Sequence, residues 1–529
     1  MSSEIELKFR IPAARLAALR RAVVTRSAVV EPLAAVYFDT PGQHLAQARV
    51  ALRLRREAGG WVQTLKAEGA TAMQRLEHNV AVPGLPGLPG DRPALDLARH
   101  QGSPAGAVLA QVLAKARAGA PPGSSPATLS ERYATDVQRT RRVLRHGAAL
   151  IELALDEGQI RAGSAACAVC EIEFELLRGP PQALLDVAAR WVGRFGLVLD
   201  VRSKSERGDR LAQGQHASPP SHARPLKLAR QASPAQALAA MLANALGQAL
   251  ANASQIADDG GQPDHLHQLR VGLRRLRSVL HVFGPLAPTA PAAPTAPLAG
   301  ADLAPRLAAL FGQLGAARDQ DAMAEWLWPA LQAAGAPALK LPARQSASPA
   351  ADVAPLLRAP ATQQLWLALL GACQPVPALP DGLPLASMPA TPPTTAATPS
   401  LQALLREPLR RRYRQVQHDA ARFDALDDAA RHRLRRRIKR LRYATELSAA
   451  LWPAKHVKRL LRNLAQAQVP LGEFNDTVVA QAHCQALAAH DGPAWFAVGW
   501  LSARRQALAP VCSQALARLA RRPGCWRRR

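Results

Sequence analysis

The sequence predicts an α+β protein: an N-terminal antiparallel β-barrel or tunnel with flanking helices, then an all-α region of two duplicated helical bundles. Three observations support this prediction. The first 211 residues contain several segments in which charged and apolar residues alternate, as they do along β-strands. From residue 229 onward, Ala, Leu and Arg recur at helical spacing. That second region also contains an internal repeat.

The segment 4–11 is the clearest predicted strand. Glu4, Glu6, Lys8 and Arg10 would share one face, because successive side chains of a strand point to opposite faces. A single strand of this kind would turn its polar face to water. Further strands are predicted at 35–39, 50–56, 61–67, 76–82, 149–155 and 169–177, and helices near 13–23, 105–118 and 181–195. So many charged strands in one region favour a closed barrel or tunnel with a charged interior.

The charge of the chain predicts a polyanionic partner. The formal net charge is +28, and residues 401–529 alone hold 26 Lys/Arg against 9 Asp/Glu. Such a field attracts nucleic acid, polyphosphate or an acidic membrane surface. Aromatic residues make up only 4 % of the chain, which argues against a platform that stacks the bases of single strands. Nucleic acid stays open as an alternative partner by charge alone.

Cysteine usage and hydropathy predict a cytoplasmic protein with reduced thiols. The chain begins with charged residues and contains no run of 18 apolar residues, so we expect neither a secretory signal nor a membrane span. The single Cys-x-x-Cys, Cys167 and Cys170, has no second pair and no nearby His ligands. It therefore predicts no metal site.

Composition divides the chain into two predicted domains. The strand-rich domain covers 1–211, a linker covers 212–228, and the helical domain covers 229–529, with repeats at about 229–333 and 400–529. Two Pro-rich insertions, at 285–297 and 334–400, interrupt the helical domain. The second contains only a short predicted helix near 362–372, and the composition predicts that both are flexible loops that bury no core.

The repeat places a basic stripe on one helix of each bundle. His267 and His432 are each followed by cations at +3, +7 and +10, which fall within about 80° of one helix face. These cations are Arg270, Arg274 and Arg277, then Arg435, Lys439 and Arg442. A Leu-Gly pair with an Asp four residues after the Gly follows in both copies, at Leu314 and Leu471. We interpret the stripes as anion-binding and not as zinc sites, because no second His or Cys stands at ligand spacing.

The N-terminal strands offer both acidic and basic sets. The acidic sets are Glu4/Glu6 and Glu171/Glu173/Glu175, to which Glu152 and Asp156 can be added; the basic sets are Arg53/Arg55, Lys66, Arg139/Arg141 and Lys204. Carboxylate oxygens suit hard divalent cations, while Lys and Arg suit phosphate oxygens. A barrel lined in this way could hold a metal–triphosphate.

Residues 1–210 resemble the CYTH family of triphosphate tunnel metalloenzymes. The resemblance lies in EIELKF at 4–9, YFDTPGQHL at 37–45, ALRLR at 51–55, WVQTLKAEG at 61–69, IELALDEGQI at 151–160, CEIEFEL at 170–176 and SKSERGDRL at 203–211. It implies an eight-stranded antiparallel tunnel that acts on triphosphates with Mg²⁺ or Mn²⁺. It implies metal ligands at Glu4, Glu6, Glu171 and Glu173, and phosphate-binding residues at Lys8, Arg53, Arg55, Lys66, Arg139 and Lys204. The catalytic set would be Glu4, Glu6, Lys8 and Lys66. The stretch 75–79 departs from the family pattern because Asn79 is neutral, so Glu77 is left out of the predicted site.

Residues 229–529 resemble a CHAD domain, with His267 and His432 at its two signature positions. The resemblance implies binding of long-chain polyphosphate by the two basic stripes, and it raises association with polyphosphate granules as an expectation. The tandem arrangement is similar to bacterial inorganic triphosphatases, so we expect hydrolysis of inorganic triphosphate to diphosphate and phosphate. Two alternatives remain open: an organic triphosphate hydrolase or nucleotide cyclase acting on thiamine triphosphate or ATP, and a polyphosphate-binding protein without catalysis.

Overall fold

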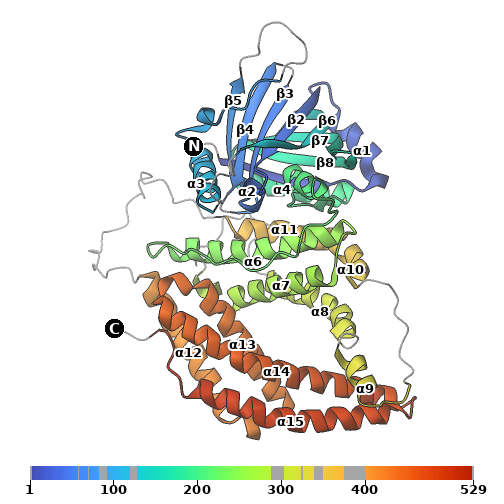
Figure 1. Ribbon diagram of the computed structural model, residues 1–529, viewed down its shortest axis with the longest axis vertical. Coiled ribbons are helices and arrows are strands. Elements are labelled where there is room, and N and C mark those ends of the chain that lie inside the picture. Colours follow the sequence, from blue (N-terminus) through green and yellow to red (C-terminus); the bar gives the residue numbers. More distant parts are fainter. Residues whose placement is uncertain are drawn as a thin grey trace, which may run out of the picture.

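A β-barrel and a helical half pack directly on each other (Figure 1). The computed structural model describes residues 3–57, 59–69, 71–82, 92–119, 128–286, 303–322, 326–338, 349–374 and 400–526. Helices α4 (Pro181–Phe195) and α11 (Pro360–Ala372) meet at the junction of the two halves. None of the described helices is both long and apolar enough to cross a membrane.

Eight antiparallel strands close into the barrel, as predicted. Their order is β5-β4-β3-β2-β6-β7-β8-β1, and pairing of β5 with β1 completes the ring. A two-residue strand, β9 (Val198–Leu199), adds to β1. The eight strands are β1 (Ser3–Arg10), β2 (Val29–Asp39), β3 (Val50–Glu57), β4 (Gly60–Glu68), β5 (Gln74–Val82), β6 (Ser130–His146), β7 (Ala149–Ala162) and β8 (Ala165–Arg178).

The apolar face of β1 packs outward, under helices, which leaves its charged face inside. Phe9 is fully buried and meets Phe174 of β8 edge to face, and Phe174 in turn meets Trp191 of α4. Burial of these rings between sheet and helix fixes which face of the strand points inward.

Three predicted helices are confirmed in the barrel half: α1 (Ala13–Val23), α3 (Pro104–Ala118) and α4. Two shorter ones are α2 (His44–Gln47) and α5 (Lys204–Leu211).

Strand β6 is missing from the strands predicted by alternation, although Arg139 and Arg141 were counted among the strand residues and β6 is the longest strand of the barrel. It pairs with β2 and β7 along most of its length. Both of its faces carry polar residues, Thr135 and Arg139 on one and Gln138 and Thr140 on the other, so no simple apolar alternation marks it. Pairing with two neighbouring strands therefore decides its conformation against a weak local signal.

The helical half contains two bundles with corresponding helices. Helix α7 carries His267 and α13 carries His432, and these two helices pack against each other. The helices besides α11 are α6 (Pro234–Ala257), α7 (Pro263–Phe283), α8 (Leu303–Ala322), α9 (Trp328–Ala333), α10 (Pro349–Arg358), α12 (Leu401–Ala421), α13 (Asp428–Leu447), α14 (Ala454–Ala488) and α15 (Ala494–Ala520). The exact domain boundaries stay a prediction.

The prediction that 334–400 buries no core is wrong for its middle part, which forms α10 and α11. Leu365, Trp366 and Leu369 of α11 are almost completely buried, and α11 packs on α4 of the barrel half. This helix is apolar on most of its circumference, which is typical of a helix buried on all sides. Residues 287–297 of the first predicted insertion, and 339–348 and 375–399 of the second, lie outside the described residues.

Trp366→Ala should destabilise the protein by about 3–5 kcal/mol, because it leaves a large cavity where the two halves meet. Denaturant unfolding followed by circular dichroism measures the change. The matched control is Trp495→Ala, which removes the same side chain from a position that is 61 % exposed. Equal effects of the two substitutions would contradict the assignment of α11 to the core.

Candidate functional sites

The barrel opens onto a cavity of about 1190 Å³, which α6 and residues 218–226 also line, and the barrel part of its wall carries acidic and basic side chains together. This confirms the charged interior expected from the alternating strands. Nine of the predicted site residues line the cavity: Glu4, Glu6, Lys8, Arg53, Arg55, Lys66, Arg139, Glu173 and Lys204. The tenth, Glu171, is buried beside Lys204, with Oε1 2.5 Å from the ammonium.

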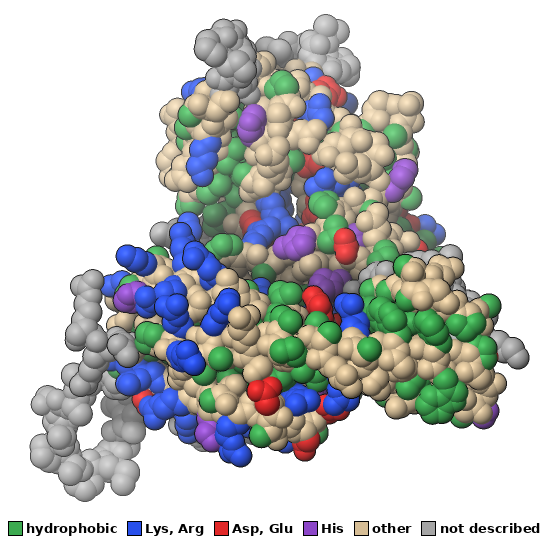
Figure 2. All heavy atoms as spheres, turned by 60° about the horizontal axis from the view of Figure 1, so that its bottom comes forward, with side chains coloured by type: hydrophobic (Ala, Val, Ile, Leu, Met, Phe, Trp, Pro, Cys, Tyr) green, Lys and Arg blue, Asp and Glu red, His purple; other side chains and the backbone are tan. Residues whose placement is uncertain are grey.

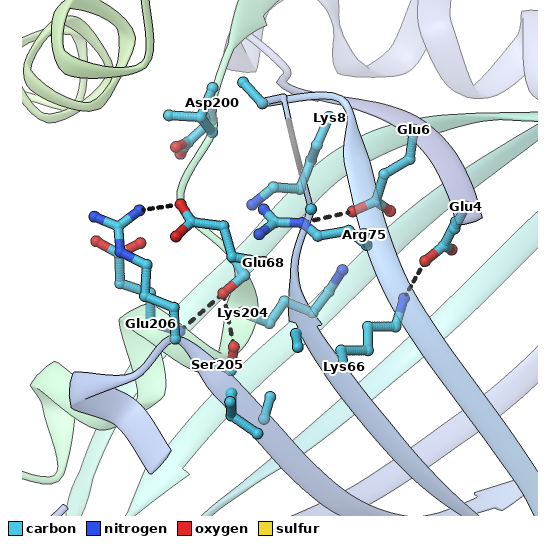
Figure 3. A pocket seen from close by; sticks show the side chains of 18 of the residues that line it. Glu4, Glu6, Lys8, Lys66, Glu68, Arg75, Asp200, Lys204, Ser205 and Glu206 are labelled. Carbon is cyan, nitrogen blue, oxygen red and sulfur yellow. Dashed lines mark hydrogen bonds and ion pairs between the residues drawn. The ribbon is translucent and has the colours of Figure 1, made fainter. Parts of the chain in front are cut away.

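One group of charges centres on Lys66 of β4. Its Nζ lies 2.8 Å from Glu4 Oε2 and 3.0 Å from Glu77 Oε2, while Arg75 Nε lies 3.5 Å from Glu6 Oε1 (Figure 3). Burial, helped by a hydrogen bond to Glu77, raises the pKa of Glu4 to about 9 against the opposing charge of Lys66. Burial also disfavours ionised Glu77, but the hydrogen bond from Glu4 and the charge of Lys66 hold the pKa of Glu77 well below its usual range. The proton on Glu4 and the ammonium of Lys66 thus reduce the repulsion between the buried side chains of Glu4 and Glu77.

A second group centres on Lys204, the first residue of α5. Its Nζ lies 2.6 Å from Asp156, 2.5 Å from Glu171 and 2.8 Å from Glu173. Arg139 of β6 reaches Asp156 and Glu173 at 2.6 and 2.5 Å. Burial opposes ionisation here, yet the charges of Lys204 and Arg139 hold the pKa of Glu173 well below its usual range. Glu173 is therefore ionised and can act as a ligand.

The three carboxylates of the second group fit a metal ion. One oxygen from each of Asp156, Glu171 and Glu173 lies within 4.8 Å of the others. Oxygen donors in this number suit Mg²⁺ or Mn²⁺. Glu4 and Glu6 are not in this cluster: Glu6 pairs in register with Glu175, one inward position along β8 from Glu173. The structure therefore divides the predicted ligand set into two groups within one cavity.

The paired arginines of β3 line the opposite wall. Arg53 donates to the Tyr37 hydroxyl at 3.0 Å, and Arg55 forms an ion pair with Glu57. The Nε atoms of both arginines are buried and have no hydrogen-bond partner within the described part of the chain. Buried donors of this kind are costly without a ligand, so they point to an anion in the cavity.

Three residues of the site were not in the predicted set. Asp156 was noted only as a possible addition, Glu77 was left out, and Arg207, which lies 2.6 Å from Glu171, was not considered. The alternation of Glu152 and Asp156 on β7 could have identified the first, and position +3 from Lys204 on a helix could have identified Arg207. Glu77 lines the cavity even though Asn79 replaces the next acidic residue.

The helical half holds the loop that carries Lys204. Arg202, which is 4 % exposed, donates to Asp200 at 2.7 and 2.9 Å within the loop. It also donates to Gln255 at 3.1 Å and to Asp258 at 2.7 Å, at the end of α6. The Arg202 carbonyl accepts a hydrogen bond from the Lys8 ammonium. A cation of the barrel wall and the loop before α5 are thus fixed by contacts from the second half of the chain.

A second cavity, of about 1390 Å³, lies between the two helical bundles, and we call it the cleft. All eight residues of the predicted stripes line it: His267, Arg270, Arg274, Arg277, His432, Arg435, Lys439 and Arg442. Figure 2 shows Lys and Arg side chains gathered on part of the helical half, next to a hollow below the barrel. The two stripes thus face one shared space.

The repeated Leu-Gly motif supports these stripes. A Cβ added at Gly315 would lie 3.6 Å from the Arg270 guanidinium, and one at Gly472 would lie 4.0 Å from that of Arg435. In the second copy, Asn475 contacts His432 at 2.5 Å and Asp476 contacts Arg435 at 3.4 Å. The repeated motif therefore lies beside the first arginine of each stripe, although a Cβ at either glycine would make only an ordinary contact there.

Burial and mutual repulsion both disfavour the positive charges in the cleft. Burial, followed by the charges of Arg435 and Arg274, lowers the pKa of Lys439 to about 7. Arg270 and Arg277 lie over the Phe311 ring at 4.7 and 5.0 Å, which covers the face of that ring. A bound polyanion would relieve the repulsion, so the cleft is suited to anions.

Comparison with known proteins agrees with this two-part architecture. A CYTH domain model matches residues 2–194, and a CHAD domain model matches residues 240–485. The chain carries a CYTH domain followed by a CHAD domain. The inorganic triphosphatase of Haemophilus influenzae is 29 % identical over 183 residues, which are 34 % of this chain and 46 % of that protein. The match thus spans about half the length of this relative.

Solved structures similar to each domain are known. The CHAD domain of Ricinus communis shares 28 % identity, covering 58 % of this chain and 98 % of that one, with a TM-score of 0.42. A Hippeastrum adenylyl cyclase candidate, described with a dominant triphosphatase activity, shares 16 % identity over 40 % of this chain and 96 % of that one, with a TM-score of 0.26. At these TM-scores neither structure carries weight for function.

Lys439 of the CHAD domain should titrate close to neutral pH, because its lowered pKa leaves most of its amine neutral above pH 7. A ¹³C NMR titration of the lysine side chains measures the midpoint, with Lys439→Met identifying the signal. Arg274→Gln removes one repelling charge and should raise that midpoint. A midpoint near the ordinary value of 10.5 would contradict the crowded cleft.

Proposed function

We propose that the CYTH barrel hydrolyses inorganic triphosphate to diphosphate and phosphate with Mg²⁺ or Mn²⁺, and that the CHAD cleft binds polyphosphate. The observation that carries the proposal is the close mixture of carboxylates and cations inside a closed barrel. Carboxylates alone would repel a triphosphate, and cations alone would only bind it. Both together suit a metal–triphosphate. The triphosphatase of Haemophilus influenzae supports the same substrate class.

In this proposal the residues of the barrel divide their roles by charge. Asp156, Glu171 and Glu173 would hold a divalent ion, and Glu4 and Glu6 would hold a second ion or orient the attacking water. The bound ion would supply neutralisation of phosphate charge. Phosphate oxygens would be bound by Lys8, Arg53, Arg55, Lys66, Arg139 and Lys204. Lys8 and Lys66 would also stabilise the charge that develops on the leaving diphosphate.

Glu173→Gln and Glu4→Gln should each lower turnover of tripolyphosphate by about 100-fold, because each removes a carboxyl group that would hold a metal ion or orient the attacking water. Phosphate release is measured with Mg²⁺, with Mn²⁺ and with chelator, and circular dichroism checks the fold. Glu131→Gln is the matched control, since that carboxylate belongs to an exposed ion pair with Arg92 outside the cavity wall. Full activity of both site variants would reject these assignments.

The inorganic substrate is preferred over a nucleotide or thiamine triphosphate because the described cavity wall offers little for a base. Tyr37 is the aromatic residue of that wall, and its ring already stacks on Tyr133 at 4.7 Å while its hydroxyl accepts from Arg53. The same rate measurement with ATP and thiamine triphosphate compares the alternatives. Faster turnover of either organic substrate would replace the inorganic assignment.

The cleft should bind polyphosphate more tightly than single-stranded DNA of equal charge. Phosphates without bases can approach both stripes, and Phe311 is already covered by Arg270 and Arg277. Displacement of a labelled polyphosphate by each polymer at fixed salt measures the preference. Arg274→Gln should weaken polyphosphate binding, whereas Arg414→Gln, an exposed cation of α12, should not. Equal displacement by the two polymers would contradict a polyphosphate site.

A further inference from the structure

The barrel cavity and the cleft share a wall. An extended segment, residues 218–226, which we call the strap, runs between them. His222, Ala223, Arg224 and Leu226 of the strap line both cavities, and so does Gln248 of α6. No other part of the described chain contributes to both linings. The strap therefore marks the place where the space inside the CYTH domain adjoins the space between the CHAD bundles.

The backbone of the strap is fixed on α6. Asn252 accepts from the Ser221 amide at 3.0 Å and donates to the Ser221 carbonyl at 2.9 Å. Asn244 donates to the Arg224 carbonyl at 3.2 Å, and the Ser218 amide donates to Gln255 at 3.0 Å. Held by its backbone in this way, the strap can present the His222 and Arg224 side chains to ligands without being displaced itself.

Cations continue from one cavity to the other. At the end of β4, Glu68 lies between Arg224 at 2.6 Å and Arg49 at 3.0 Å, and all three side chains are at least 36 % exposed. Exposed ion pairs of this kind contribute little, about 0–1 kcal/mol, so phosphate oxygens can take the place of Glu68. Arg49 belongs to the barrel cavity, and Arg224 belongs to both. Once it displaces Glu68, an anionic chain leaving the barrel would meet Arg49 and then Arg224.

The size of the cavities favours one extended ligand. A typical small-molecule pocket has about 300–1,000 Å³, and each of these cavities exceeds that range, at about 1190 and 1390 Å³. A triphosphate would fill only part of the barrel. Linear inorganic polyphosphate carries a negative charge on every phosphate unit, so it can pair with each cation along this row.

Resting on the proposed function, we propose that one linear inorganic polyphosphate occupies both sites at once. Its end lies in the CYTH barrel, its next units contact Arg49 and Arg224, and its remainder lies in the cleft between the stripes. Long-chain polyphosphate and tripolyphosphate then exclude each other from the barrel, although the cleft is a separate cavity. The strap is the contact that joins the two parts of the site.

Inhibition kinetics of the full-length protein test this proposal. Consumption of labelled tripolyphosphate is followed at several concentrations of long-chain polyphosphate, with free Mg²⁺ or Mn²⁺ held constant because both polymers bind metal. We expect competitive inhibition: the KM for tripolyphosphate rises and kcat does not change. Arg224→Gln should raise the inhibition constant about threefold to fivefold, the effect of losing one exposed charged contact.

Lys227→Gln is the matched control. It removes an exposed cation three residues along the chain that lines neither cavity, and it should leave the inhibition constant unchanged. Non-competitive inhibition, or none, would overturn the single extended site while the triphosphatase assignment stands. Competitive inhibition that Arg224→Gln and Lys227→Gln alter equally would show that the polymer makes no contact with the strap and would also overturn it. Absence of tripolyphosphate turnover would reject the proposed function and this inference with it.

Discussion

Lys204 lies within 2.8 Å of Asp156, Glu171 and Glu173, and the barrel could not keep three such carboxylates together without a cation among them. Burial penalises each charge, and the penalty is offset only when opposite charges and hydrogen bonds compensate it. Arg139 and the other cations of the wall complete this balance. The balance explains why strands with a charged face can close into a barrel instead of turning that face to water.

A balanced interior also determines which ligands fit. An anion without a metal ion would be repelled by the carboxylates. A metal ion without an anion would be repelled by the lysines and arginines. A metal–triphosphate carries both signs, so it can replace internal ion pairs with external ones at little electrostatic cost. The inward position of the charges depends in turn on the rings of Phe9 and Phe174, which hold the apolar faces of β1 and β8 against α4.

The CHAD domain is joined to this interior by more than a linker. Arg202 connects Asp258 of α6 with the loop that presents Lys204, and the buried helix α11 packs on α4. Loss of either contact would change the positions of residues in the barrel wall. The strap adds a third connection, because Arg224 pairs with Glu68 while it lines the cleft.

Much of this arrangement follows from sequence because it depends on local periodicity. The alternation of Glu4 to Arg10 predicted a charged interior, and the His-x-x-Arg spacing predicted eight of the residues that line the cleft. Other features depend on contacts between distant segments and could not be read locally. Strand β6 is set by its neighbours β2 and β7. The helix near 362–372 was predicted, but its burial as α11 was not, because Pro-rich segments flank it. Arg207 joins the site only because α5 lies beside Glu171.

The most direct test of the central claim is a binding titration of Mn²⁺ with a non-hydrolysable imido analogue of tripolyphosphate, each alone and then together. The balanced interior predicts strong mutual dependence: each ligand binds weakly alone and far more tightly in the presence of the other, and Glu173→Gln removes that gain. Equal affinity of each ligand with or without its companion would show that the carboxylates and cations act independently, and would contradict the account.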